Sequence, residues 1–190
     1  MPDGFVPIVK VIEIANDGYG FSSGSWYDAI SRKIQHFIDT LESQPEGGIC
    51  VCCDVDILFT RKSKDLADYL RAEIANKDLD MLFMREDTGE CVNGGFYCVR
   101  NSEPVRNALK QAMLFCEKRT SFADQDYFNG IFKQSGVKWD YIDIAIVAWG
   151  WRVYDSRRTL FHHAVCSRNL DDKLRQQQEI CRQFQIELPE

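Results

Sequence analysis

The sequence of 190 residues is 45% hydrophobic and 27% charged, which is typical of one globular domain with a substantial core. Its formal net charge of −6 argues against nucleic acid or an anionic membrane surface as the main partner. No apolar run approaches the roughly 18 residues that a membrane span needs, and the opening residues lack the basic and apolar regions of a signal peptide, so we expect a cytoplasmic location.

The amino-terminal part of the chain predicts a strand, a loop and an amphipathic helix. The β-branched run Val6–Ile14 is typical of a strand, and Asn16–Ser25 is a loop rich in glycine and serine. From Ser25 to Leu41 the apolar residues recur at helical spacing, which predicts a helix with one buried face. This helix carries Lys33.

A short apolar run that ends in two carboxylates follows. Ile49–Cys53 leads directly into Asp54 and Asp56, and we expect the run to be a strand buried on both faces in the middle of a sheet. Two carboxylates at the carboxyl end of such a strand suit Mg²⁺ or Mn²⁺, because a hard cation takes oxygen ligands and relieves their mutual repulsion. The alternative is that one aspartate caps the next turn and the other is solvated.

Helices and strands then alternate along the chain. The expected elements are a helix capped by Ser63 that runs to Ile74, a strand at Met81–Met84, a polar loop at 85–93, a strand at Gly94–Val99, a helix from Ser102 to Cys116, a short helix near Phe122–Asn129, short strands and loops over 137–164, and a final helix at Asn169–Phe184 with Leu174 and Ile180 inward. This alternation predicts an α/β fold with a mostly parallel central sheet and helices on both faces, followed by a short mixed-strand region and a carboxyl-terminal helix.

The eight cysteines are expected to be free thiols in a reducing compartment. Cys50 and Cys53 form a C-x-x-C pair, but a spacing of three on a strand places them on opposite faces, which is wrong for a shared zinc ion. Cys98 and Cys116 lie on elements that are predicted to be buried, where free cysteine behaves as a small apolar residue.

Four other groups of residues have both a functional and a structural interpretation. Asn93-Gly94-Gly95 indicates either a plain turn or backbone that lies close to a ligand. Asp124, before Gln125, is either a helix cap or part of a site.

The other two groups are near the carboxyl end. His162 and His163 point to opposite faces if they lie on a strand, so at most one of them can face a given site, and a single histidine is more often structural. Lys173 is either a site residue or a solvated surface charge.

Together these segments resemble a known family. Four segments occur in the order of the motifs of nucleotide-diphospho-sugar transferases: CCDVDILF, VNGGFYCVR, FADQDYFNGIF and FHHAVCSRNLDDK. These enzymes are glycosyltransferases of the GT-A fold, which is a Rossmann-like architecture. The family motifs are Asp-x-Asp after a buried strand, an Asn-x-Gly-Phe strand, an Asp-Gln helix start and a late histidine. The resemblance covers roughly residues 26–180.

The resemblance implies roles for individual residues. The ligands of a divalent metal, Mn²⁺ or Mg²⁺, match Asp54, Asp56 and His163. His162 is a possible substitute for His163 if the register is shifted by one residue. The segment that lines the donor-sugar pocket matches Asn93, Gly94 and Gly95, and the pair beside the reacting carbon matches Asp124 and Gln125. A basic position that reaches the donor matches Lys33, and a contact to the diphosphate matches Lys173.

The implied function is metal-dependent transfer of a sugar from a nucleoside-diphosphate sugar, such as a UDP-sugar, to a hydroxyl of a glycan or another acceptor, with retention of configuration. We expect a single domain over residues 1–190. In such enzymes a further strand–helix unit, which holds part of the nucleobase site, usually precedes the first strand. Either this chain is a shortened version, or the loop around Asp17–Phe21 holds the base, or the unit belongs to a longer protein with further domains.

Two alternatives stay open. A haloacid-dehalogenase-like phosphatase also has Asp-x-Asp after a buried strand, but it wants Thr or Val two places later, where this chain has Leu58. A non-catalytic module that binds sugar nucleotides or a partner would retain the same fold.

Overall fold

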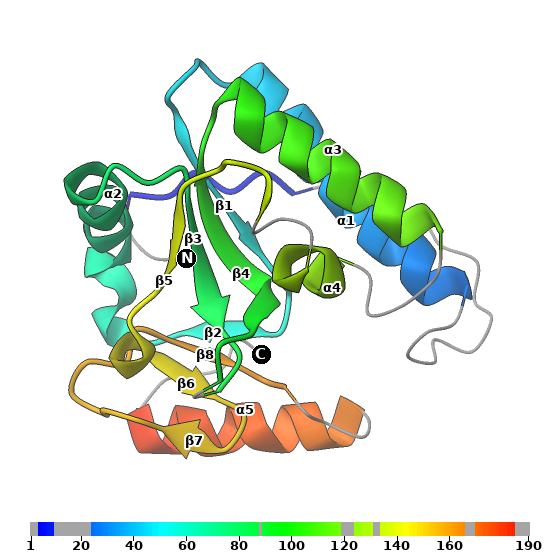
Figure 1. The fold of residues 1–190 in the computed structure, drawn as a ribbon. Helices are drawn as coiled ribbons and strands as arrows, with labels where there is room; N and C mark the ends of the chain where they lie inside the picture. The colour runs from blue at the N-terminus through cyan, green and yellow to red at the C-terminus, as the bar shows by residue number, and fades with distance from the viewer. Residues whose placement is uncertain are drawn as a thin grey trace.

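The computed structural model describes residues 4–9, 24–87, 89–118, 124–130, 134–165 and 170–184. In chain order these residues form α1 (Gly24–Ser43), β1 (Ile49–Cys53), β2 (Ile57–Phe59), α2 (Leu66–Asn76), β3 (Met81–Arg85), β4 (Val92–Arg100), α3 (Glu103–Glu117), α4 (Asp124–Asn129), β5 (Trp139–Tyr141), β6 (Val147–Trp149), β7 (Arg152–Val153), β8 (Phe161–His163) and α5 (Leu170–Phe184). The predicted α/β class, with helices that flank a central sheet, is confirmed (Figure 1).

The central sheet has four strands in the order β1-β4-β3-β5. Strand β4 runs antiparallel to both β1 and β3, and only β3 and β5 are parallel among the described pairs of this sheet. The prediction of a mostly parallel sheet is therefore wrong for this part of the chain. The reason is the short connection between β3 and β4, since parallel neighbours need a crossover of about a dozen residues or more.

Strand β1 also differs from its predicted position. It lies at the edge of the described sheet, and only Cys52 is buried within it. The strands with continuous burial are instead β3, which is buried from Met81 to Met84, and β4, which is buried from Val92 to Val99. The interior of the sheet is thus built by the two strands of this hairpin.

Helices pack against both faces of the central sheet, as predicted. Alternate residues of β3 point to opposite sides: Met81 and Phe83 join a core with α1, α3 and α4, and Leu82 and Met84 join a second core with α2. Figure 1 shows α1 and α3 side by side on one side of the sheet and α2 on the other.

A second four-stranded sheet, in the order β2-β8-β6-β7, lies at one end of the molecule beside α5 (Figure 1). Strand β8 is antiparallel to β2 and parallel to β6. The chain passes from one sheet to the other within the Asp54–Asp56 turn, because β1 belongs to the first sheet and β2 to the second. This passage places the two carboxylates between the sheets.

Several local predictions are corrected. Residues 5–9 are not in a strand, and residues 10–14 of the predicted strand lie outside the described residues. Ser63 does not cap α2: it lies in a 3₁₀ turn, its hydroxyl donates to the Thr60 carbonyl, and Asp65 occupies the cap position. Strand β4 begins at Val92 rather than at Gly94.

The boundaries of α5 agree with the predicted carboxyl-terminal helix, but its buried face differs in part. Ile180 is buried as predicted, whereas Leu174 is 44% exposed and the buried positions around it are Gln176 and Cys181. The Gln176 side-chain amide donates to the Val165 carbonyl. A polar contact of Gln176 therefore lies where an apolar contact of Leu174 was predicted.

The cysteines of the described residues are free thiols, as predicted, and Cys166 lies outside those residues. Among the described helices, none has the length and apolar character that would let it cross a bilayer.

Candidate active site

The Asp54–Asp56 turn is held by both sheets. The Asp54 amide donates to the Gly95 carbonyl of β4 at 2.8 Å, and the Asp56 carbonyl accepts from the Ala164 amide, just after β8, at 3.3 Å. These bonds fix the turn from two sides, so the two carboxylates have defined positions relative to β4 and β8.

Three potential metal ligands meet at this turn. Asp54, Asp56 and His163 each offer one ligand atom, and these atoms lie within 4.8 Å of one another. His163 is brought there by the pairing of β2 with β8, in which it lies opposite Ile57. Its Nε2 is 3.3 Å from Oδ1 of Asp56, so residues more than a hundred positions apart in the sequence become neighbours.

The two histidines face opposite ways, as the strand pattern predicted. The His162 ring is buried, and its Nε2 lies 2.8 Å from the Gly150 carbonyl. Burial lowers the pKa of His162 to about 4, more than the carbonyl contact raises it, so its imidazole is neutral at physiological pH and its Nε2 donates to the carbonyl. His163 is therefore the histidine that faces the carboxylates.

Gly95 leaves the space that the His163 ring fills. A Cβ atom added to Gly95 would lie 2.3 Å from Cε1 and 2.8 Å from Nε2 of that ring. The Gly95 amide donates to Oδ1 of Asn93 at 2.9 Å. The predicted role of Asn93 and Gly95 in lining a sugar pocket stays a prediction, while the structure adds a contact with the histidine.

Two lysines neutralise the carboxylates. Lys33 Nζ lies 3.2 Å from Asp54 Oδ1 and 3.2 Å from the Gly94 carbonyl, and Lys173 Nζ binds Oδ2 of Asp56. Burial alone would raise the pKa of Asp56, but hydrogen bonds and charge from His163 and Lys173 outweigh it and hold this pKa well below the ordinary value. Asp56 is thus ionised, as a metal ligand must be.

A carboxylate that the sequence interpretation missed lies nearby. Glu86 is half-buried and accepts a hydrogen bond from the Gln125 side-chain amide, whose own oxygen accepts from the Gly94 amide at 3.3 Å. Burial raises the pKa of Glu86, although the bond from Gln125 lowers it. The signal was present, since Glu86 follows the end of the buried strand β3 just as Asp54 follows β1.

Two of the predicted site residues, Asp124 and Gln125, begin α4. Gln125 contacts the Gly94 backbone and so adjoins the segment that holds His163. Asp124 is the first residue of α4, and its side chain lies outside the described part.

The residues present fit a divalent cation. Oδ1 of Asp56 is buried and lacks a hydrogen-bond donor among the described residues, apart from the long contact with His163. Carboxylate oxygens are the hard ligands that Mg²⁺ and Mn²⁺ prefer. Two carboxylates and one imidazole together form a set of ligands that Mn²⁺ accepts. A cation at this turn would satisfy the buried oxygen.

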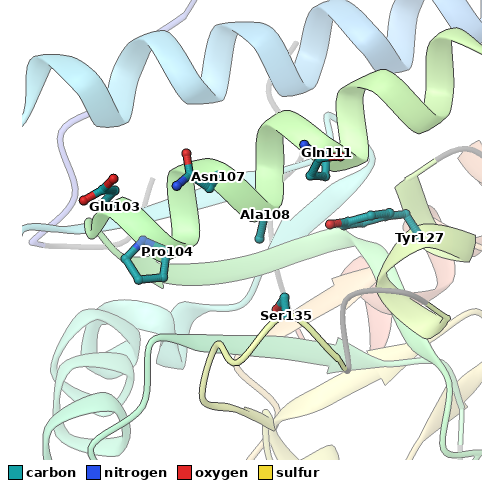
Figure 2. Close-up of a pocket in the computed structure, with 7 residues that line it drawn as sticks. All are labelled: Glu103, Pro104, Asn107, Ala108, Gln111, Tyr127 and Ser135. Atoms are coloured by element: carbon teal, nitrogen blue, oxygen red, sulfur yellow. The ribbon is translucent and has the colours of Figure 1, made fainter.

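A hollow of about 470 Å³ lies elsewhere, between α3 and the segment that precedes β5 (Figure 2). Its walls carry one carboxylate, that of Glu103, and none of the predicted site residues. The lining residues are Glu103, Pro104, Asn107, Ala108, Gln111, Tyr127 and Ser135. Without a second charged ligand, this hollow does not compete with the Asp54–Asp56 turn as a site for a metal and a diphosphate.

Comparisons with known proteins identify a family and a fold. A family model described as nucleotide-diphospho-sugar transferase matches residues 6–177. Sixteen chains of known structure match the fold. One of them is described as the crystal structure of a glycosyltransferase involved in the glycosylation of the major capsid of PBCV-1. The match has a TM-score of 0.62 and 12% sequence identity, and it covers 82% of this chain and 79% of that one. At that identity the likeness shows the fold alone. No curated protein matches by sequence.

Proposed function

Because this chain belongs to the nucleotide-diphospho-sugar transferase family, we propose that it moves a sugar from a nucleoside-diphosphate sugar, in particular a UDP-sugar, to a hydroxyl of a glycan or another acceptor. Asp54, Asp56 and His163 would hold a divalent cation, Mn²⁺ or Mg²⁺. Family membership favours this activity over the phosphatase alternative, which has no support beyond the Asp-x-Asp sequence.

The observation that carries the proposal is the convergence of the three ligands, with a buried oxygen of Asp56 whose one contact among the described residues is His163 Nε2 at 3.3 Å. A bound cation would give this oxygen a closer partner, as buried polar groups nearly always have. The two flanking lysines add positive charge where a diphosphate would bind, since lysine is a common partner of phosphate oxygens.

The residues divide the chemistry between them. When bound, a divalent cation would supply Lewis-acid stabilisation of the charge that develops on the leaving diphosphate. Lys33 and Lys173 would bind and orient the phosphate oxygens. Gln125, held between Gly94 and Glu86, would face the donor sugar together with Asp124. We propose retention of configuration on the family resemblance, and the anomeric form of the product, measured by NMR, tests it.

The direct test is a thermal-shift panel of nucleotide sugars with and without Mn²⁺. A ligand that binds only the native state at a hundred times its Kd adds about 2.7 kcal/mol to the free energy of unfolding, so the expected result is a melting-temperature rise of several degrees that requires nucleotide and metal together. A panel in which every nucleotide sugar leaves the melting temperature unchanged would contradict the proposal. Binding of a nucleotide sugar without any sugar transfer would contradict its catalytic part.

Lys173 yields a separate prediction. Lys173→Met should weaken binding of a nucleoside diphosphate about tenfold or more, because a charge-assisted hydrogen bond contributes about 1.5–3 kcal/mol. Binding of Mn²⁺ alone should stay the same or become tighter, because Lys173 occupies Oδ2 of Asp56 and competes with a cation. Isothermal titration calorimetry measures both affinities.

The matched control is Arg175→Met, which removes a cation of the same helix whose partner is Asp172 rather than a site carboxylate. Equal loss of nucleotide affinity in both variants would mean that the overall charge of α5, and not Lys173, attracts the diphosphate.

A further inference from the structure

We infer that the β6–β7 hairpin is the acceptor subsite and that the exposed indole of Trp151 is a platform for a sugar ring of the acceptor. The inference rests on the proposed function and assigns the acceptor a chemical class, a pyranose or furanose ring with a free hydroxyl. It concerns the hairpin that pairs with the strand of His163.

The strand order places the hairpin directly beside the candidate metal site. In the second sheet β8 lies between β2, which follows Asp56, and β6, which begins the hairpin. Trp149 of β6 lies opposite His163 of β8, and the Gly150 amide donates to the His163 carbonyl at 2.9 Å. Trp151 is therefore two residues beyond the direct neighbour of a proposed metal ligand.

Trp151 is an exposed aromatic residue in the turn of the hairpin. It is 60% exposed, and it is the sole aromatic side chain among the large, highly exposed apolar residues of the described ranges. Single exposed apolar residues are common on protein surfaces, so it is the position of Trp151 beside the candidate site that points to a ligand surface. Gly150, with φ of +58°, lies in the turn just before Trp151 and adopts a left-handed backbone conformation that favours glycine.

The hairpin is also fixed in place and carries polar groups. Arg152 and Tyr154 both bind the carboxylate of Asp87, in the loop between β3 and β4. The neighbour of Asp87 is Glu86, which binds Gln125. The hairpin is thus tied to the loop that carries part of the proposed donor site, and its platform does not depend on an order–disorder step.

This combination matches the two faces of a sugar. The C–H groups on one face of a sugar ring pack against an aromatic ring, while its hydroxyls accept and donate hydrogen bonds at the edge. Trp151 supplies the aromatic face, and Arg152 and Asp87 supply charged hydrogen-bonding groups beside it. The proposed donor contacts come from other elements, namely Lys33 of α1, Gly94 of β4 and Gln125 of α4, so no residue of the hairpin is assigned to the donor.

The test separates acceptor binding from donor chemistry. Trp151→Ala and wild-type protein are compared for transfer from UDP-sugars to a panel of p-nitrophenyl glycosides, for binding to a glycan array in the presence of UDP and Mn²⁺, and for hydrolysis of the donor without acceptor. The expected result is a KM for the acceptor raised about tenfold and a corresponding loss of array binding, as lost aromatic stacking predicts, with donor hydrolysis unchanged.

Two variants control for the nature of the ring and for general effects. Trp151→Phe keeps an aromatic face and should retain most of the acceptor affinity. Leu114→Ala removes an apolar side chain that is 46% exposed on α3, and it should change neither the acceptor KM nor donor hydrolysis.

The outcomes are distinguishable. An acceptor KM within twofold of wild type in Trp151→Ala overturns the inference, and so does a parallel fall in donor hydrolysis, which would make Trp151 a general part of the site. Wild-type protein that hydrolyses the donor but neither binds nor glycosylates any glycan also overturns it. Absence of donor binding and hydrolysis in wild type would instead refute the proposed function.

Discussion

Asp56→Ala should lower the rate of sugar transfer by about 10²–10³-fold, which is the cost of removing one preorganised electrostatic stabiliser of a developing charge. The same variant should lose the Mn²⁺-dependent stabilisation by a nucleoside diphosphate. Both effects follow from the position of Asp56, whose carboxylate meets His163 with one oxygen and Lys173 with the other. Initial rates and thermal shifts measure the two effects on the same preparation.

Asp56→Asn and Asp68→Ala sharpen the comparison. The asparagine variant keeps the size of the side chain and removes its charge, so it should behave like Asp56→Ala if charge and metal ligation are what matter. Asp68 is an exposed carboxylate on α2 whose partner is Arg71, and Asp68→Ala should leave transfer unchanged. Full activity of either Asp56 variant, or of wild-type protein in excess chelator, would refute metal dependence.

Gly95→Ala should displace the His163 ring and so abolish metal binding without any change to a ligand. The added Cβ would lie 2.3 Å from Cε1 of His163, a distance that real Cβ contacts do not reach, and 3.0 Å from Oδ1 of Asn93. The substitution should lower the free energy of unfolding by about 1–3 kcal/mol, the usual cost of overpacking a filled space. Urea unfolding and Mn²⁺ titration measure the two consequences.

A double variant identifies the cause. In a His163→Ala background the clash with the ring is gone, so Gly95→Ala should destabilise much less than it does in wild type, and the difference is the coupling energy of the pair. Gly89→Ala is the matched glycine control, because its Cβ would meet the nearest atom, the Glu86 carbonyl oxygen, at an ordinary 3.4 Å. Wild-type Mn²⁺ affinity in Gly95→Ala would show that the ring does not occupy this space.

The sequence by itself was sufficient for features that depend on local periodicity. The apolar spacing of residues 25–41 and 102–116 predicted α1 and α3 closely, because a helix satisfies its own backbone and needs only one buried face. Strand alternation also separated His162 from His163, since successive side chains on a strand point to opposite faces. The order of the motifs predicted the family, which the match over residues 6–177 confirms.

Only the tertiary structure decided which strands pair, and in which direction. Residues 49–53 have the composition of an interior strand, yet they form an edge of the described sheet, because pairing depends on partners distant in the sequence and on how the helices cover each face. The same holds for the contacts at the site. Residues tens of positions apart are joined by three contacts, of Lys173 with Asp56, of Gln125 with Glu86 and of the His163 ring with Gly95. No local pattern encodes such contacts, because they arise when separate elements pack together.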